Sequence, residues 1–174
     1  MTMNAEKNVY KGLKIIFSLA IGLMVIAAVA VLGMAFVLHT SQAQSFIQSI
    51  FDGDLIYGAK TPMLFASPLI IGSLMILFIL NGILFYFTRS FFKNLEMDRI
   101  FVSENVTTAK KVAALLLILS FASSLPDVMA QLQGFSTGGF SLDLTYMVGA
   151  AIVWALAKIL ERANLIAEEN KLTI

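Results

Sequence analysis

The chain has 174 residues, of which 59% are hydrophobic and 13% charged, and its formal net charge at pH 7 is +1. Soluble domains average roughly 45–50% apolar and about 25% charged residues, so this chain has too few polar side chains to cover a water-soluble core of its size. The near-zero charge excludes direct nucleic-acid binding, and the absence of cysteine excludes disulfides and thiolate metal sites. Because the apolar residues come in long blocks, the sequence predicts an all-α integral membrane protein with one membrane domain, residues 1–174.

The first predicted membrane span covers residues 13–38. Residues 15–38 are 24 positions without a charge, and at about 1.5 Å per residue they exceed the ~30 Å thickness of the hydrocarbon core. The competing interpretation is a cleaved signal peptide, because Lys7, Lys11 and Lys14 resemble the basic first region of one. Signal peptides have apolar regions of only about 7–15 residues, so a permanent span is favoured.

Residues 39–67 form the predicted outer loop. It begins with His39, the only histidine, which cannot assemble a transition-metal site alone and is expected at the surface. Residues 46–51 would place their apolar members on one helical face. This pattern indicates either a short helix in the outer interface or a loop packed over the bundle, and both alternatives stay open.

The second and third predicted spans, residues 68–88 and 112–132, each carry one candidate polar residue. Asn81 is expected to hydrogen-bond to a neighbouring helix rather than to bind a substrate. Asp127 is the only acidic residue inside a predicted span, and an intramembrane carboxylate is a candidate proton or cation site. Its position near the outer end of the span, directly after Pro126, which is expected to loosen the helix there, favours a structural or interfacial role instead.

The predicted inner loop, residues 89–111, is the most polar segment of the chain. Within it, Ser103 or Asn105 is expected to cap the helix that follows, because short polar side chains satisfy the free backbone groups of a helix start.

The fourth predicted span, residues 144–160, is the weakest. Its uncharged part, residues 144–157, has only 14 positions, or about 21 Å of helix. Lys158 must therefore extend toward the headgroups, and Trp154 is expected near the same interface. The helix is expected to continue into the cytoplasm as a C-terminal segment, residues 161–174.

The basic residues set the orientation. Lys and Arg near span ends are retained on the cytoplasmic side during insertion. Of the twelve, only Lys60 falls on the outer side, and both termini are therefore expected in the cytoplasm. The other eleven precede the first span, lie in the inner loop or follow the fourth span: Lys7, Lys11, Lys14, Arg89, Lys93, Arg99, Lys110, Lys111, Lys158, Arg162 and Lys171.

No catalytic motif accompanies this plan. The sequence has no glycine-rich phosphate loop, no His-Glu-x-x-His and no Gly-x-Ser-x-Gly. Glu168 and Glu169 are adjacent on a helix, so they point about 100° apart and do not form a carboxylate pair for acid–base work. We therefore expect no enzyme activity, no cofactor and no bound metal.

Two cytoplasmic stretches resemble a family of small bacterial four-helix membrane proteins, domain-of-unknown-function family 2975. Residues 92–95 and 99–105 are similar to the family's Phe-x-x-Glu-Asn segment, and residues 167–174 to its terminal Glu-Glu-Asn-Asp-Leu-Thr-Val/Ile. Lys171 departs from the usual acidic residue. The resemblance implies no enzyme activity, a location in the bacterial plasma membrane, and a gene neighbour of the Cro/CI helix-turn-helix type. It therefore implies a membrane protein that binds a cytoplasmic transcription regulator.

The leading hypothesis is a non-enzymatic membrane regulator that binds or sequesters such a DNA-binding protein through its inner loop and C-terminal segment. The alternatives are a small transporter that uses Asn81 and Asp127, or an immunity or envelope-stress protein whose outer loop opposes membrane-active peptides. A fourth interpretation is a bundle whose inner loop and C-terminal segment only cap each other, in which Glu104 or Glu168 would pair with Arg99 or Arg162. A homo-oligomer stays open. The candidate partner-binding residues are Arg99, Phe101, Glu104, Asn105, Glu168, Glu169, Asn170 and Leu172.

Overall fold

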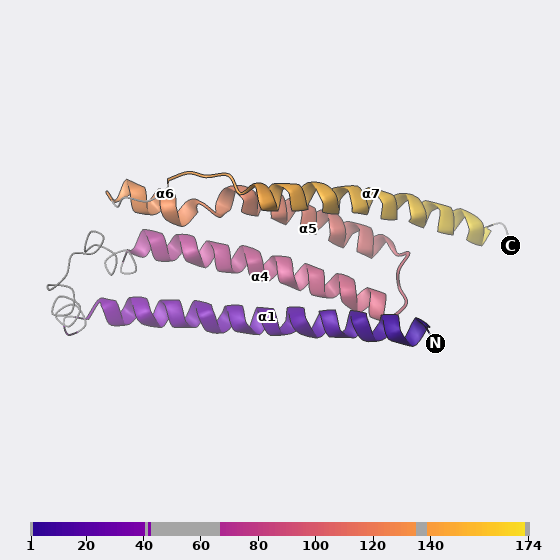
Figure 1. The fold of residues 1–174 in the computed structure, drawn as a ribbon, viewed down its shortest axis with the longest axis horizontal. Coiled ribbons are helices and arrows are strands. Elements are labelled where there is room, and N and C mark those ends of the chain that lie inside the picture. The colour runs from indigo at the N-terminus through magenta and orange to yellow at the C-terminus, as the bar shows by residue number, and fades with distance from the viewer. Residues whose placement is uncertain (1, 41, 43–66, 135–138, 173–174) are drawn as a thin grey trace. The chain divides into compact units, whose positions relative to one another are not determined.

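The computed structural model describes residues 2–40, 42, 67–134 and 139–172, and side chains within 6–40, 42, 67–134 and 139–169. Every regular element in these ranges is an α-helix, which confirms the all-α prediction for the described part of the chain. The expected interfacial helix at residues 46–51 lies outside the described residues. Figure 1 traces the helices α1 (Thr2–Leu38), α4 (Pro68–Glu96), α5 (Ser103–Ala122), α6 (Leu125–Leu132) and α7 (Leu144–Leu172).

Four helical stretches of the described chain are long and apolar enough to cross a membrane, and each contains one predicted span. At the polar ends the helices run further than the spans predicted from sequence, because hydropathy marks only the apolar part of a helix and these helices continue through polar residues. The third stretch joins α5 and α6. The four are Glu6–Leu38, Pro68–Glu96, Ser103–Leu132 and Leu144–Glu169.

The break between α5 and α6 follows from Pro126. Proline has no backbone N–H to donate and its ring crowds the preceding turn, so the ladder of α5 cannot continue through it. The chain turns at Ser123 and Ser124, and α6 then begins with Pro126 in its first turn. The Ser124 hydroxyl donates to the carbonyl of Phe121 (3.1 Å), which satisfies one acceptor at the end of α5. The sequence predicted a loosened helix here, and the structure has a complete interruption.

The chain forms two compact units, and each is described by itself. Unit 1 consists of Met1–Leu23, Leu80–Ser120 and Asp143–Ile174. Unit 2 consists of Met24–Ile79 and Phe121–Leu142. All the partner-binding candidates lie in unit 1.

Within unit 1, α5 and α7 pack along a seam of mostly small side chains. A seven-residue spacing keeps positions on one helix face, as in coiled coils. Where α5 ends and α7 begins, the Ser120 hydroxyl donates to the Asp143 carbonyl, and the Asp143 amide donates to the Ser120 carbonyl, both at 3.0 Å. The buried members at this spacing are Val106, Ala113 and Ser120 on α5, and Ala150, Ala157 and Asn164 on α7.

Asp143 also begins α7. Its carboxylate accepts hydrogen bonds from the backbone amides of Thr145 (2.9 Å) and Tyr146 (3.4 Å). A carboxylate before the first turn satisfies free amides and complements the positive end of the helix dipole. The same residue therefore starts α7 and fixes its register against α5.

Candidate functional site

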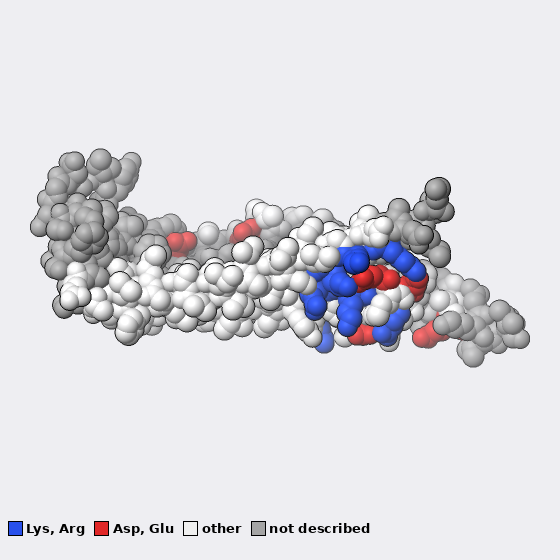
Figure 2. Space-filling view, turned by 90° about the horizontal axis from the view of Figure 1, so that it is seen from below, with Lys and Arg blue, Asp and Glu red and all other residues white. Residues whose placement is uncertain are grey.

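Charged side chains from every helix of unit 1 take part in the contacts described below, and we call these residues together the charged end. Figure 2 shows Lys and Arg side chains crowded around Asp and Glu side chains in a single patch. On the face drawn in Figure 2, the visible Lys and Arg side chains of the described residues thus lie together rather than spread along the helices. The members that make the contacts described below are Lys7, Lys14, Arg89, Glu96, Asp98, Arg99, Glu104, Lys110, Lys111, Lys158 and Glu161.

Two ion pairs and one hydrogen bond join α1 to the end of α4. Lys14 Nζ lies 2.5 Å from Glu96 Oε2, and Lys7 pairs with Asp98. One turn further into the apolar part, Arg89 Nε donates to the hydroxyl of Ser18 (2.6 Å). These contacts fix the first helix beside the second at the charged end.

Aromatic packing continues this contact toward the apolar part of unit 1. The ring of Phe17 stacks on Phe92 with centroids 5.7 Å apart and lies tilted against Phe85 at 5.9 Å. Pairs of this kind contribute about 0.5–1.5 kcal/mol beyond the area they bury. The α1–α4 pair is therefore held by ring packing as well as by charge.

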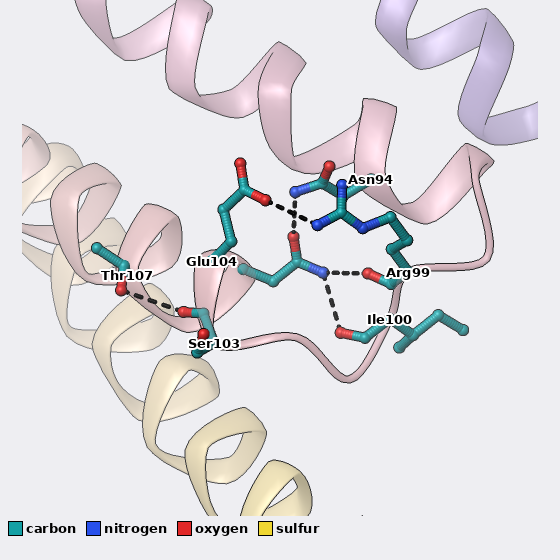
Figure 3. Close-up of polar contacts among 7 residues, drawn as sticks. Asn94, Arg99, Ile100, Ser103, Glu104 and Thr107 are labelled. Carbon is teal, nitrogen blue, oxygen red and sulfur yellow. Dashed lines mark hydrogen bonds and ion pairs between the residues drawn. The ribbon is translucent and has the colours of Figure 1, made fainter.

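The loop between α4 and α5 is held by one buried side chain, Asn105. Its amide nitrogen donates to the carbonyls of Arg99 (2.6 Å) and Ile100 (2.9 Å), and its carbonyl oxygen accepts from the Asn94 side chain (2.8 Å). Figure 3 shows the bond from Asn94 on α4 to α5 and the two bonds to the loop carbonyls of Arg99 and Ile100. α5 begins at Ser103, so Asn105 lies inside its first turn. The prediction that Asn105 caps α5 is wrong, because its side chain bonds the preceding loop.

The chain leaves α4 through Asp98, whose φ of +58° is in the left-handed region. Aspartate tolerates this conformation better than most residues. The amide of Arg99 then donates back to the carbonyl of Asn94 (2.9 Å), which closes the end of the helix. The loop is consequently tied down at its first residues and, through Asn105, at its middle.

The outer surface of this loop is apolar and exposed. Phe101 is 56% exposed, Met97 47% and Ile100 38%. Arg99 and Glu104 flank them and form an ion pair of 3.2 Å in which both side chains are more than half exposed. Such a pair contributes only about 0–1 kcal/mol. We call these five residues the loop patch. The Arg99–Glu104 pair is one that the self-capping interpretation predicted.

A second charged contact joins α5 to α7. Glu161 accepts hydrogen bonds from Lys110 (2.7 Å) and from Lys158 (3.0 Å). Glu161 follows the predicted fourth span, and these two bonds, first that of Lys110, lower the pKa of its carboxyl group below the ordinary value. Lys158 also lies 5.9 Å from the centre of the Trp154 ring. Lys111 makes a similar contact with Phe87, at 5.1 Å.

The structure treats the predicted candidates differently. Arg99, Phe101 and Glu104 are exposed in the loop patch, while Asn105 is fully buried and out of reach of a partner. On α7, the side chains at positions 168 and 169 are exposed. Asn170 and Leu172 are within α7, but their side chains lie outside the described residues.

The two intramembrane candidates fall in different units. Asn81 lies in α4 within unit 1. Asp127 lies in unit 2, in the first turn of α6, where a carboxylate complements the positive end of the helix dipole. His39 is exposed and its Nδ1 lies 2.8 Å from the carbonyl of Ala35. Among the described residues no group of three or more His, Cys, Asp or Glu side chains could hold a metal ion.

Sequence reasoning did not identify the contacts that join distant segments. Asn94, Lys110 and Glu161 carried no signal of their own, since each lies among other polar residues near a span end. Asn164 was also missed: its side-chain amide is buried without a hydrogen-bond partner in the described part of the chain. Comparison of the chain with protein-family models, with curated proteins and with solved structures gives no match.

Proposed function

We propose that this chain is a non-enzymatic, multi-pass protein of the bacterial plasma membrane whose charged end faces the cytoplasm and binds a protein partner there. Large apolar side chains support the membrane location. Leu23, Ile26 and Phe36 of α1 are more than 60% exposed, which water would penalise and lipid would not. The gathering of the basic residues into one patch supports the cytoplasmic orientation of that end and of both termini.

The observation that carries the binding proposal is the loop patch. Interfaces are enriched in aromatic residues, Met and Arg, and their anchors are aromatic side chains that a partner buries. Phe101 and Met97 fit this description, with Arg99 beside them. The loop is fixed by the buried bonds of Asn105, so a partner would not have to order it on binding.

The partner we propose is a small cytoplasmic DNA-binding regulator of the helix-turn-helix type, as the family resemblance implies. Binding at the membrane would keep such a protein away from its operators. The exposed carboxylates at positions 168 and 169 on α7 would offer a second contact, complementary to the basic surface that a DNA-binding protein carries.

Orientation is tested by cysteine labelling, for which the chain is suited because it has no native cysteine. Ser103→Cys and Thr40→Cys both replace exposed residues, the first in the predicted inner loop and the second in the predicted outer loop. In intact cells, a membrane-impermeant maleimide is expected to label Thr40→Cys and to spare Ser103→Cys until the membrane is permeabilised. The reverse pattern would place the charged end outside and exclude a cytoplasmic partner.

Partner binding is tested by pull-down from native membranes in mild detergent, with mass spectrometry to identify the protein recovered. A small DNA-binding protein is expected. Its recovery should fall at least about tenfold in Met97→Ser/Phe101→Ser, because loss of a buried aromatic anchor typically costs 2 kcal/mol or more, as a rough guide. Phe140→Ser is the matched control, since Phe140 is as exposed as Phe101 but lies in unit 2.

Equal recovery from the double variant and the control would contradict binding through the loop patch.

In cells, Glu168→Lys/Glu169→Lys should change transcription of the partner's targets while insertion stays normal. If the wild-type chain recovers only envelope proteins, the regulator proposal fails. Transport through Asp127 and immunity through the outer loop would then be the functions to test.

A further inference from the structure

A groove of about 420 Å³ runs along unit 1 between α5 and α7. Alanines of both helices, among them Ala113 and Ala150, form its floor, because their short side chains let the helices approach and leave the surface hollow. Leu117, Met147 and Trp154 form its walls. The groove is therefore apolar along its length and open on one side.

Two lysines stand at one end of this groove. Lys110 lies one turn before Ala113 on the same face of α5, and Lys158 lies one turn after Trp154 on α7, with its ammonium 5.9 Å from the ring centre. Both bind Glu161. Two positive charges and one negative charge leave a net charge of +1 at the head of the groove.

We propose that this groove binds an acyl chain of an anionic phospholipid, with the lipid phosphate against Lys110 and Lys158. The proposal rests on the membrane insertion proposed above. From Lys158 to Met147 α7 rises about 16 Å, close to the ~15 Å that the acyl chains of one leaflet extend, so one chain is long enough to fill the groove from a headgroup beside Lys158. An apolar groove of this length beneath a positive head is complementary to a lipid that has an acyl chain and a net negative headgroup.

A second copy of the chain is the other occupant that would suit small side chains. A two-fold interface brings the same surface of both copies together. It would place two net-positive heads at the same depth, side by side, where like charges repel in a medium of low dielectric. The charge at the groove head therefore favours the anionic lipid.

Trp154 makes the proposal testable, because it is the only tryptophan of the chain and lines the groove. The full-length protein is placed in vesicles that contain phosphatidylglycerol or phosphatidylcholine with brominated acyl chains, which quench tryptophan on contact. Each Lys or Arg near an anionic surface contributes roughly 1 kcal/mol, so one net charge predicts about a fivefold preference for phosphatidylglycerol.

Charge variants separate this site from general attraction to an anionic surface. Lys110→Gln/Lys158→Gln should reverse the preference, because Glu161 alone leaves a net charge of −1, and Glu161→Gln should raise the preference by about a further fivefold, since it leaves both lysines unpaired. Lys11→Gln/Lys93→Gln is the matched control: it also removes two positive charges, from exposed positions outside the groove, and should keep the preference. Equal quenching by both wild-type lipids, or a preference that survives in Lys110→Gln/Lys158→Gln, would overturn the proposal.

Filling the groove tests the acyl-chain contact itself. Ala114→Leu/Ala151→Leu, at two exposed lining positions, should weaken quenching by both lipids, whereas Ala155→Leu, exposed but outside the groove, should not. Vesicle flotation distinguishes the two levels of failure. Protein that floats with the vesicles but escapes quenching has its groove covered, as by a second copy, and only the lipid site fails. Protein that does not float contradicts the membrane proposal as well.

Discussion

Replacing Asn105 by alanine is expected to lower the free energy of unfolding by about 2–4 kcal/mol, because buried polar groups left without partners each cost roughly 1–3 kcal/mol. Asn105 is 0% exposed and makes three hydrogen bonds. The substitution leaves the carbonyls of Arg99 and Ile100 and the amide of Asn94 without their partner. Thermal unfolding of the detergent-solubilised protein measures the effect.

The comparison variant is Thr107→Ala, two positions further along α5. Its exposed hydroxyl donates to the Ser103 carbonyl at 3.1 Å, where water can replace it. Its unfolding free energy should change by less than about 0.5 kcal/mol. A double-mutant cycle of Asn94→Ala with Asn105→Ala should show a coupling energy of at least about 0.5 kcal/mol. If Asn105→Ala is as stable as Thr107→Ala, the loop is held by something other than this network.

Asn105→Ala also tests whether partner binding requires the loop patch to be held in place. Asn105→Ala keeps every exposed side chain of the loop patch but removes the bonds that fix the loop. Partner recovery should therefore fall in Asn105→Ala although Phe101 is intact, because ordering the loop on binding then costs free energy. In the proposed function Asn105 would therefore position the loop patch rather than contact the partner, because its side chain is buried.

The four long helical stretches were predictable from sequence because each contains a long, almost uncharged apolar run. Residues 68 and 144, predicted as the starts of the second and fourth spans, are the first residues of α4 and α7. Pro126 likewise predicted the weak point of the third span, since a ring without an N–H acts locally. Hydropathy does not predict where a helix ends among polar residues. This is why the predicted spans stop short of the observed ends of α4 and α7.

The candidate site was predictable only in outline. Composition predicts the polar loop, but the hydrogen-bond or ion-pair partner of each side chain depends on how the helices are aligned along one another. Lys110 and Glu161 are 51 positions apart, and nothing in either segment specifies the pairing. Asn105 has the residue type of a helix cap, and only the observed start of α5 shows that it faces backwards into the loop.

The small residues illustrate the same limit. Ser120 with Ser124 and Ala151 with Ala155, four positions apart, are the kind of pair by which membrane helices approach each other. Ser120 does lie in the α5–α7 seam, but on α7 the buried positions are Ala150 and Ala157, while Ala151 and Ala155 are exposed. Every apolar helix contains several stripes of small residues. Packing against the partner helix determines which stripe is buried, so the buried stripe is identified from the structure and not from the sequence.

The packing of α5 against α7 through small residues predicts the effect of a larger side chain in the seam. Ala157→Leu should lower the free energy of unfolding by about 1–3 kcal/mol, because added side-chain volume in a packed interior forces backbones apart. Ala157 is 0% exposed in the seam. Ala155→Leu makes the same change at an exposed position of the same helix and should have almost no effect. Thermal unfolding in detergent compares them, and equal stability would mean that α5 and α7 do not pack through this face. If the seam opens as expected, Lys110, Lys158 and Glu161 also separate from one another. The stronger quenching of Trp154 by phosphatidylglycerol should then disappear in Ala157→Leu, although all three charges are still present.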